Sequence, residues 1–234
     1  MERKRISQKI TAVLLALSIL LTATIMPNLD EFRVFADVIA TAGWADDYDD
    51  KSLFFIESEA DLAAFSAASE SKTFTGKTVY LSTDVTLTQP LFNSTKAFEG
   101  TFNGNGYTIT INTPVSIFGN MSGATVENLN INLNVSTGGT YGAICSSASS
   151  NRDKTITVRN CFVKGNIDYN SQHTSSLLGG FFAEVSQGEY VFDSCISTVN
   201  ISSTNPKALG GFIGHINLLG SENYSVSFIN CVSG

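Results

Sequence analysis

Apolar and polar residues alternate in short runs over most of the chain. Tyr107, Ile109 and Ile111 alternate with polar residues directly after Asn103–Gly106. This alternation has the period of a half-buried strand, and Asn-Gly pairs favour a tight turn because they tolerate positive φ. A lone hairpin would leave its apolar face with nothing to pack against. The stretch therefore predicts the entry to a stack of strands.

The same pattern recurs at a regular interval. Leu129, Cys161, Cys195 and Cys231 each follow an Asn or Ser, in "VENLNI", "VRNCFV", "FDSCIS" and "FINCVS". The intervals are 32, 34 and 36 residues (161 − 129, 195 − 161 and 231 − 195). A glycine-led apolar stretch precedes each of the last three, in "YGAIC", "GGFFAEV" and "GGFIGHI". Self-similarity at this scale is typical of solenoids.

The residue types indicate strands rather than helices. Helical repeats of this length need Ala, Leu, Glu and Lys at a spacing of about 3.6 residues, whereas β-branched residues alternate with polar ones here. We expect an all-β fold, a right-handed parallel β-helix of about five coils whose strands pair with the next coil at about 4.8 Å. The Asn or Ser beside each repeated position should form a bend. Leu129, Cys161, Cys195 and Cys231 should line one interior column.

A short helix is predicted ahead of the strands. Ser58 followed by Asp61 resembles a capping box, and Leu62 and Phe65 fall on one face at helical spacing. Such a helix would cover an exposed sheet end. "TVYLSTDVTLTQ" follows and predicts two short strands that meet at a bend. We expect a β-helix domain over residues 52–234, with its N-terminal cap at 52–78 and repeats of about 34 residues.

Residues 1–36 have the features of a signal peptide. The apolar stretch Ile10–Met26 follows a basic start, and Val34-Phe35-Ala36 places small residues where a signal peptidase cleaves. Cleavage is expected after Ala36, with Ala42 as a second candidate site. An uncleaved membrane anchor is the alternative, since about 17 residues is the lower limit of a membrane span. We therefore predict export to the cell surface or the medium, with no membrane contact after cleavage.

The segment that follows, residues 37–51, is acidic and contains "WADDYDD". A solvated linker is favoured over a calcium site, because the spaced ligands, glycine and glutamate of a calcium loop are missing. Without residues 1–36 the chain keeps nine basic and 18 acidic residues, a net charge of −9. Such an acidic chain is a poor partner for nucleic acid or anionic lipid.

The order "FIESEADLAAFSAASESKTFTGKTVYLSTDV … AFEGTFNGNGYTI" resembles the entry segment of bacterial surface proteins with GLUG-type repeats. "GGFFAEV … FDSCISTVNI" and "GGFIGHI … FINCVSG" resemble the repeats themselves. Similar stretches occur in adhesin-like proteins of Gram-positive bacteria and in the non-catalytic region of some IgA-cleaving metalloproteases. The resemblance covers Ser52–Gly234 and implies a scaffold. The Trp-Pro-Ile-Gly stretch often found before the "FEGTFNGNGYTI" element is absent, as is any His-Glu-x-x-His motif. The resemblance thus implies no protease activity.

The four cysteines are expected to be buried thiols. The repeated position accepts Leu or Cys, and free Cys packs as a small hydrophobe. Export and the even count leave a disulfide open as an alternative, although in-register parallel neighbours approach poorly for one. A metal site is less favoured, and Cys145 should pack elsewhere.

Neither histidine nor carboxylate spacing predicts a catalytic, cofactor or metal site. His173 and His215 have no second ligand at a metal-binding spacing. A polysaccharide-cleaving site would need clustered carboxylates, but the acidic residues are scattered over different repeat positions, and so are the basic ones: Asp153, Asp168, Glu184, Glu189, Asp193, Lys154 and Arg159. Four tyrosines near repeat edges are compatible with core packing or with a sugar-binding platform: Tyr141, Tyr169, Tyr190 and Tyr224.

The expected function is that of an exported, non-catalytic surface protein, adhesin-like or structural, with a host glycan or an extracellular protein as partner. The alternatives are a polysaccharide-active β-helix enzyme, a lyase or hydrolase, and the non-catalytic arm of a larger surface protease. "FINCVSG" contains no helix that would cap the last repeat. We therefore expect further repeats or another chain to cover that end.

Overall fold

The computed structural model describes residues 48–92, 96–149, 154–171, 176–203, 207–217 and 224–234. All of them belong to one compact unit, Trp44–Gly234. The expected signal peptide (1–36), Asp153 and His173 lie outside the described residues. Strands dominate the described part, so the all-β prediction is confirmed at the level of fold class. Within these ranges, no helix has the length and apolarity needed to cross a membrane.

The largest sheet contains seven strands, and every neighbouring pair in it is parallel. In spatial order its strands are β1 (Leu53–Ile56), β2 (Thr78–Leu81), β4 (Thr101–Asn103), β6 (Thr125–Glu127), β10 (Thr155–Arg159), β14 (Gly188–Asp193) and β18 (Tyr224–Ile229).

A second parallel sheet contains six strands. Its order is β3 (Val85–Leu87), β5 (Thr108–Ile111), β7 (Asn130–Thr137), β11 (Phe162–Tyr169), β15 (Ile196–Ser203) and β19 (Val232–Ser233). Two parallel sheets of three strands complete the described part. One is β8 (Tyr141–Gly142), β12 (Leu177–Gly179) and β16 (Ala208–Gly210), and the other is β9 (Cys145–Ser149), β13 (Phe182–Ser186) and β17 (Ile213–Asn217).

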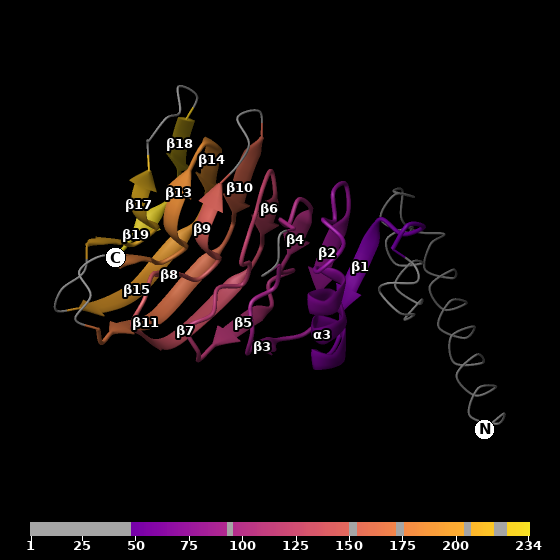
Figure 1. Ribbon diagram of the computed structural model, residues 1–234, viewed down its shortest axis with the longest axis horizontal. Helices are drawn as coiled ribbons and strands as arrows, with labels where there is room; N and C mark the ends of the chain where they lie inside the picture. Colours follow the sequence, from indigo (N-terminus) through magenta and orange to yellow (C-terminus); the bar gives the residue numbers. More distant parts are fainter. Residues whose placement is uncertain (1–47, 93–95, 150–153, 172–175, 204–206, 218–223) are drawn as a thin grey trace, which may run out of the picture. The chain divides into compact units, whose positions relative to one another are not determined.

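The strand register follows the sequence repeat. Val126 pairs with Val158, Val158 with Phe192, and Phe192 with Phe228. These partners are separated by the 32, 34 and 36 residues that separate the repeated Leu and Cys positions. In Figure 1 the strands of the two large sheets accordingly follow one another in the order of the sequence colours. The repeated units predicted from the sequence are therefore neighbours in space, each paired with the next.

The predicted helix is confirmed as α3 (Glu59–Ala68). Ser58 caps it by accepting a hydrogen bond from the Asp61 amide (3.3 Å), and the Asp61 carboxylate accepts one from the Glu57 amide (3.1 Å). The pair resembles a capping box in which Asp replaces Glu and reaches the amide of the residue before the cap. Leu62 and Phe65 are buried, and the helix packs against β1 and β3 at the first end of both large sheets.

Two features of the N-terminal region differ from the sequence expectation. Residues 53–56, expected inside the cap, form β1, the first strand of the seven-stranded sheet. Tyr48, expected in the solvated linker, is buried and accepts a hydrogen bond from the Phe74 amide (2.9 Å). Its ring meets the Phe74 ring edge-on at 5.1 Å. The packed region therefore already includes Tyr48, because an aromatic ring among acidic residues still gains by burial.

The last repeat exposes apolar residues that earlier repeats bury. Phe228 is 49% exposed and its in-register neighbour Phe192 is fully buried. Leu209 is 46% exposed and its neighbour Leu178 is fully buried. The large exposed apolar side chains of the described residues are Ile196, Leu209, Ile216, Phe228, Ile229 and Val232. Five of the six lie on β16–β19, the outermost strands of the four sheets.

Candidate functional site

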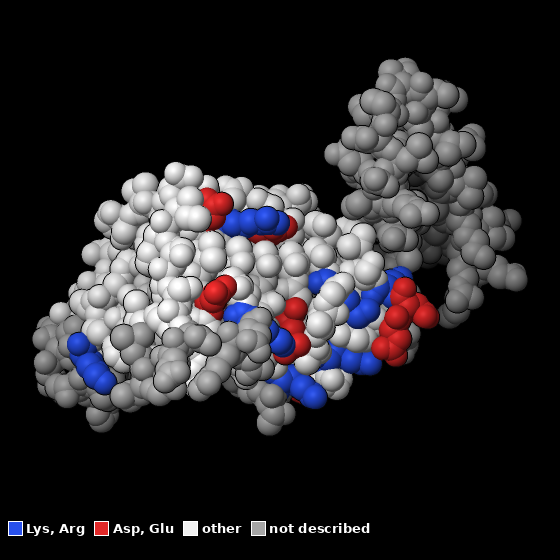
Figure 2. Space-filling view, turned by 90° about the horizontal axis from the view of Figure 1, so that it is seen from above, with Lys and Arg blue, Asp and Glu red and all other residues white. Residues whose placement is uncertain are grey.

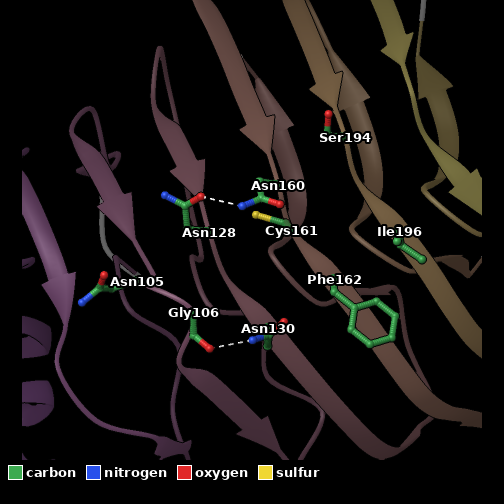
Figure 3. Close-up of a pocket in the computed structure, with 9 residues that line it drawn as sticks. All are labelled: Asn105, Gly106, Asn128, Asn130, Asn160, Cys161, Phe162, Ser194 and Ile196. Carbon is green, nitrogen blue, oxygen red and sulfur yellow. Dashed lines mark hydrogen bonds between the residues drawn. The ribbon is translucent and has the colours of Figure 1, made fainter.

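An open groove follows the line where the seven-stranded sheet passes into the six-stranded sheet. It encloses about 440 Å³ and is lined by Asn105, Gly106, Asn128, Asn130, Asn160, Cys161, Phe162, Ser194 and Ile196. Figure 3 shows these residues on consecutive repeats, so that the groove crosses several strands. The lining is built from repeated positions, which ties the groove to the repeat itself.

The bend residues between the two sheets form one wall of the groove. Asn128, Asn160 and Ser194 have φ values of 52°, 50° and 55°, the left-handed region. Asn tolerates this conformation better than most residues because its short side chain bonds locally. The prediction that the Asn or Ser beside each repeated position forms a bend is confirmed, and Asn230 (φ 52°) continues the column.

Hydrogen bonds between repeats hold these amide groups in place. Asn160 Nδ2 donates to Asn128 Oδ1 at 2.7 Å, and Asn128 Nδ2 donates to Asn103 Oδ1 at 3.3 Å. Asn130 Nδ2 donates to the Gly106 carbonyl at 2.7 Å. Each bond uses one of the several donor and acceptor positions of a carboxamide. The ladder therefore orients the amides while leaving polar atoms for a ligand.

The other wall of the groove is apolar. Asn130, Phe162 and Ile196 are in-register neighbours on β7, β11 and β15. The Phe162 ring is half-buried, and Ile196 is 42% exposed. Lys164 Nζ lies 5.9 Å from the centre of the Phe162 ring. The groove thus combines fixed amides with one aromatic and one aliphatic surface.

Cys161 contributes a buried thiol to the groove floor. Its side chain is buried and donates to the Arg159 carbonyl at 3.2 Å. Burial raises the pKa of the Cys161 thiol well above its usual value. Burial therefore favours the protonated thiol over the reactive thiolate at this position.

The cysteine column is confirmed. Leu129, Cys161 and Cys195 are buried and precede in-register residues of β7, β11 and β15. Cys231 holds the same position in the last repeat and is partly exposed. All four cysteines are free thiols, so the disulfide alternative is not realised. Cys145 is buried on β9, away from the column, and burial raises its pKa to about 12.

The tyrosines do not form an exposed platform. Tyr141, Tyr169 and Tyr190 are buried, and Tyr190 donates to the Ala148 carbonyl at 2.9 Å. Tyr224 is half-buried. Core packing, one of the two interpretations left open by the sequence, is therefore the one observed for the first three.

The acidic residues are spread over three sheets. Asp168 is on β11, Glu184 on β13, and Asp193 on β14. Glu189 also lies on β14 and accepts a hydrogen bond from Thr155 at 2.9 Å. His215 Nδ1 lies 3.8 Å from a Glu184 oxygen. Among the described residues, no three His, Cys, Asp or Glu side chains gather as metal ligands would.

A second depression lies beside α3 and encloses about 620 Å³. Its lining consists of Ala63, Ser66, Ala67, Ser69, Glu70, Gln89 and Pro90. Small side chains dominate, and there is no aromatic ring to orient a ligand. The groove between the large sheets is therefore the stronger candidate.

No family model, curated protein or solved structure matches this chain. The resemblance to GLUG-repeat surface proteins therefore stays a prediction. Sequence reasoning assigned the bend role to Asn128 and Asn160 but missed their part in a groove. Phe162 was missed as well, although strand alternation next to buried Cys161 and Val163 was a signal that its ring faces outward.

Proposed function

We propose that this chain is an exported, non-catalytic bacterial surface protein, built as a right-handed parallel β-helix that serves as an adhesin-like binding module or scaffold. The pairing of every repeat with the next, in parallel and in register, supports this architecture. Stacked units of this kind provide long surfaces on which ligands bind.

The observation that carries the non-catalytic assignment is the use of charged side chains between repeats. Arg159 pairs with Glu127 in the preceding repeat, and Lys154 pairs with Glu99 at 2.8 Å. Figure 2 shows most basic side chains of the visible face beside acidic ones. Carboxylates engaged in this way support the stack and are poorly placed for acid–base work.

The rival enzyme function is less well supported by the carboxylates of the described residues. Cleavage of a glycosidic bond by two carboxylates needs them about 5–10 Å apart, flanking one bond. Asp168, Glu184 and Asp193 belong to three different sheets. Their separation favours binding without turnover.

The exposed apolar strands β16–β19 support a partner at that end. In this proposal, further repeats or another chain pair with β16–β19 and continue the four sheets. The edges of these strands are unpaired and carry the exposed apolar side chains Leu209 and Phe228, which favours the addition of further strands.

Two experiments test the proposed function. Expression of the full chain in a Gram-positive host, followed by N-terminal sequencing of the extracellular protein, should give a start at Asp37. An intact N-terminus in the membrane fraction would contradict the export step. Incubation with a panel of polysaccharides and extracellular proteins should give binding without new reducing ends or unsaturated products. Turnover of any polysaccharide would favour the enzyme alternative, and a protease domain in the same reading frame would favour the protease arm.

A further inference from the structure

We propose that the groove lined by Asn128, Asn160 and Phe162 binds a neutral saccharide chain. The inference deepens the proposed function, since it rests on the chain being a binding protein and names the ligand class. It is argued from three properties of the groove: its fixed amides, its half-buried aromatic ring and its lack of charged lining residues.

The amides offer hydrogen bonds that match sugar hydroxyls. A hydroxyl both donates and accepts, and a carboxamide presents an acceptor and a donor side by side. Asn160 is exposed and spends its Nδ2 on Asn128, while its Oδ1 accepts no hydrogen bond from the described residues. The hydrogen bond to Asn128 already fixes the Asn160 side chain, so ligand binding costs little further side-chain entropy.

The apolar wall suits the C–H faces of a sugar ring. Phe162 and Ile196 stand next to each other on neighbouring strands, one aromatic and one aliphatic. A flat apolar surface beside fixed polar groups is the usual composition of a small-ligand site. The volume of about 440 Å³ is adequate for a short oligosaccharide segment. The lining extends over consecutive repeats, which suits a chain rather than a single sugar (Figure 3).

The charges around the groove argue for a neutral ligand. No lining residue is charged. Just outside, Arg159 and Asp193 are in-register neighbours of opposite sign. This pair gives little net field, and Lys164, whose Nζ lies 5.9 Å from the centre of the Phe162 ring, is a single exposed charge screened by salt, so an acidic polysaccharide gains little attraction there.

The test is a glycan array probed with the full chain secreted by the Gram-positive host. It carries neutral oligosaccharides (fragments of glucans, xylans and mannans), desialylated protein glycans, and acidic controls (hyaluronan and polygalacturonate). Titration calorimetry then measures the affinity of the strongest ligand. Both groups of neutral ligands offer the same hydroxyls and C–H faces. Binding to the glucan, xylan or mannan fragments would indicate a plant or microbial polysaccharide as the source, and binding to the desialylated glycans would indicate a glycoprotein.

Two variants remove one wall each. Phe162→Ala should weaken binding about tenfold or more, and Phe162→Trp should restore it because the ring is kept. Asn160→Gly removes the amide yet accepts the positive φ, and it should weaken binding about threefold to tenfold. Asn166→Ala is the matched control. Asn166 is also an exposed Asn on β11, bonded by Asn200 of the next repeat at 3.5 Å, and it lies outside the groove lining.

Unchanged affinity for Asn166→Ala with losses for Phe162→Ala and Asn160→Gly supports the proposal. The proposal is overturned if the chain binds only the acidic controls, binds no glycan, or keeps full affinity in both groove variants. Binding of an extracellular protein without turnover would overturn the saccharide inference alone. Polysaccharide cleavage would overturn the proposed non-catalytic function itself.

Discussion

Gly179 occupies a corner where a side chain has no room. A Cβ built there would lie 1.9 Å from the Phe182 carbonyl oxygen and 2.8 Å from the Gly214 amide nitrogen. The corresponding glycine of the next repeat, Gly210, has the Ile213 carbonyl oxygen at 1.9 Å. The double glycines of the repeat therefore permit the turn from β12 to β13, because both obstacles are backbone atoms rather than mobile side-chain ends.

Gly179→Ala should lower the free energy of unfolding by about 2 kcal/mol. Overpacking usually costs about 1–3 kcal/mol, and here the backbone itself must move by about 1 Å to reach an acceptable contact. The smaller entropy of the unfolded Ala variant returns only about 0.4–1 kcal/mol. For a chain of this size the net loss corresponds to a fall in Tm of about 4–8 °C.

Urea unfolding followed by circular dichroism measures the difference, with Gly139→Ala as control. A Cβ at Gly139 meets no atom within 4 Å, so this variant should stay within about 0.5 kcal/mol of the parent or gain slightly. If Gly179→Ala were as stable as Gly139→Ala, the close approach of backbone at the corner would be refuted as the reason for the repeated glycines.

Three further predictions concern the thiols, a charged pair and the cap. Alkylation of the native chain at pH 8, read by mass spectrometry, should label Cys231 first and spare Cys145, whose buried thiol has its pKa raised to about 12; equal labelling of both would contradict the burial. Burial raises the pKa of Glu99, but hydrogen bonds from Lys154 and Thr75 outweigh burial and lower this pKa overall. The ionised Glu99 therefore stabilises the fold at a pH above the pKa of Glu99 in the unfolded chain, and this stabilisation is lost as the pH falls through the pKa of Glu99 in the folded chain. Lys154→Met should therefore cost up to about 1 kcal/mol at pH 7 and almost nothing near pH 2, and a pH-independent difference in urea unfolding would count against the pair. Phe65→Ala should cost about 3–5 kcal/mol in the same assay, since the ring is fully buried in the cap; a loss below 1 kcal/mol would show that α3 is not an integral part of the core.

The repeat and the cap were predictable because they depend on local chemistry. Leu129, Cys161 and Cys195 share a position that must be apolar in every repeat, so spacing alone indicated their column. Ser58 accepts a hydrogen bond from the Asp61 amide of α3, and Asp61 accepts one from the Glu57 amide just before the helix, both within one turn of the chain. Such signals survive in a single sequence because each involves a few neighbouring residues.

The groove was not predictable in the same way. It depends on where the bend residues Asn128, Asn160 and Ser194 lie relative to Phe162 and Ile196. That placement follows from how the seven-stranded sheet meets the six-stranded sheet and not from any single residue. The tyrosines illustrate the same limit. Tyr190 lies near a repeat edge in the sequence, yet its hydroxyl reaches the Ala148 and Ser186 carbonyls inside the structure. Side-chain partners from different repeats decide burial, and their distances follow only from the packed strands.

The pairing of each strand with one that precedes it has a consequence for how the molecule is made. At about 5–20 residues per second, a ribosome needs about two to seven seconds for one 34-residue repeat, whereas small domains with non-local strand pairing fold in about milliseconds to seconds. The α3 end emerges first, and every later repeat meets a finished template upstream. Growth is then vectorial. A lesion near α3 deprives all later repeats of their template, whereas one in the last repeat leaves everything upstream already built.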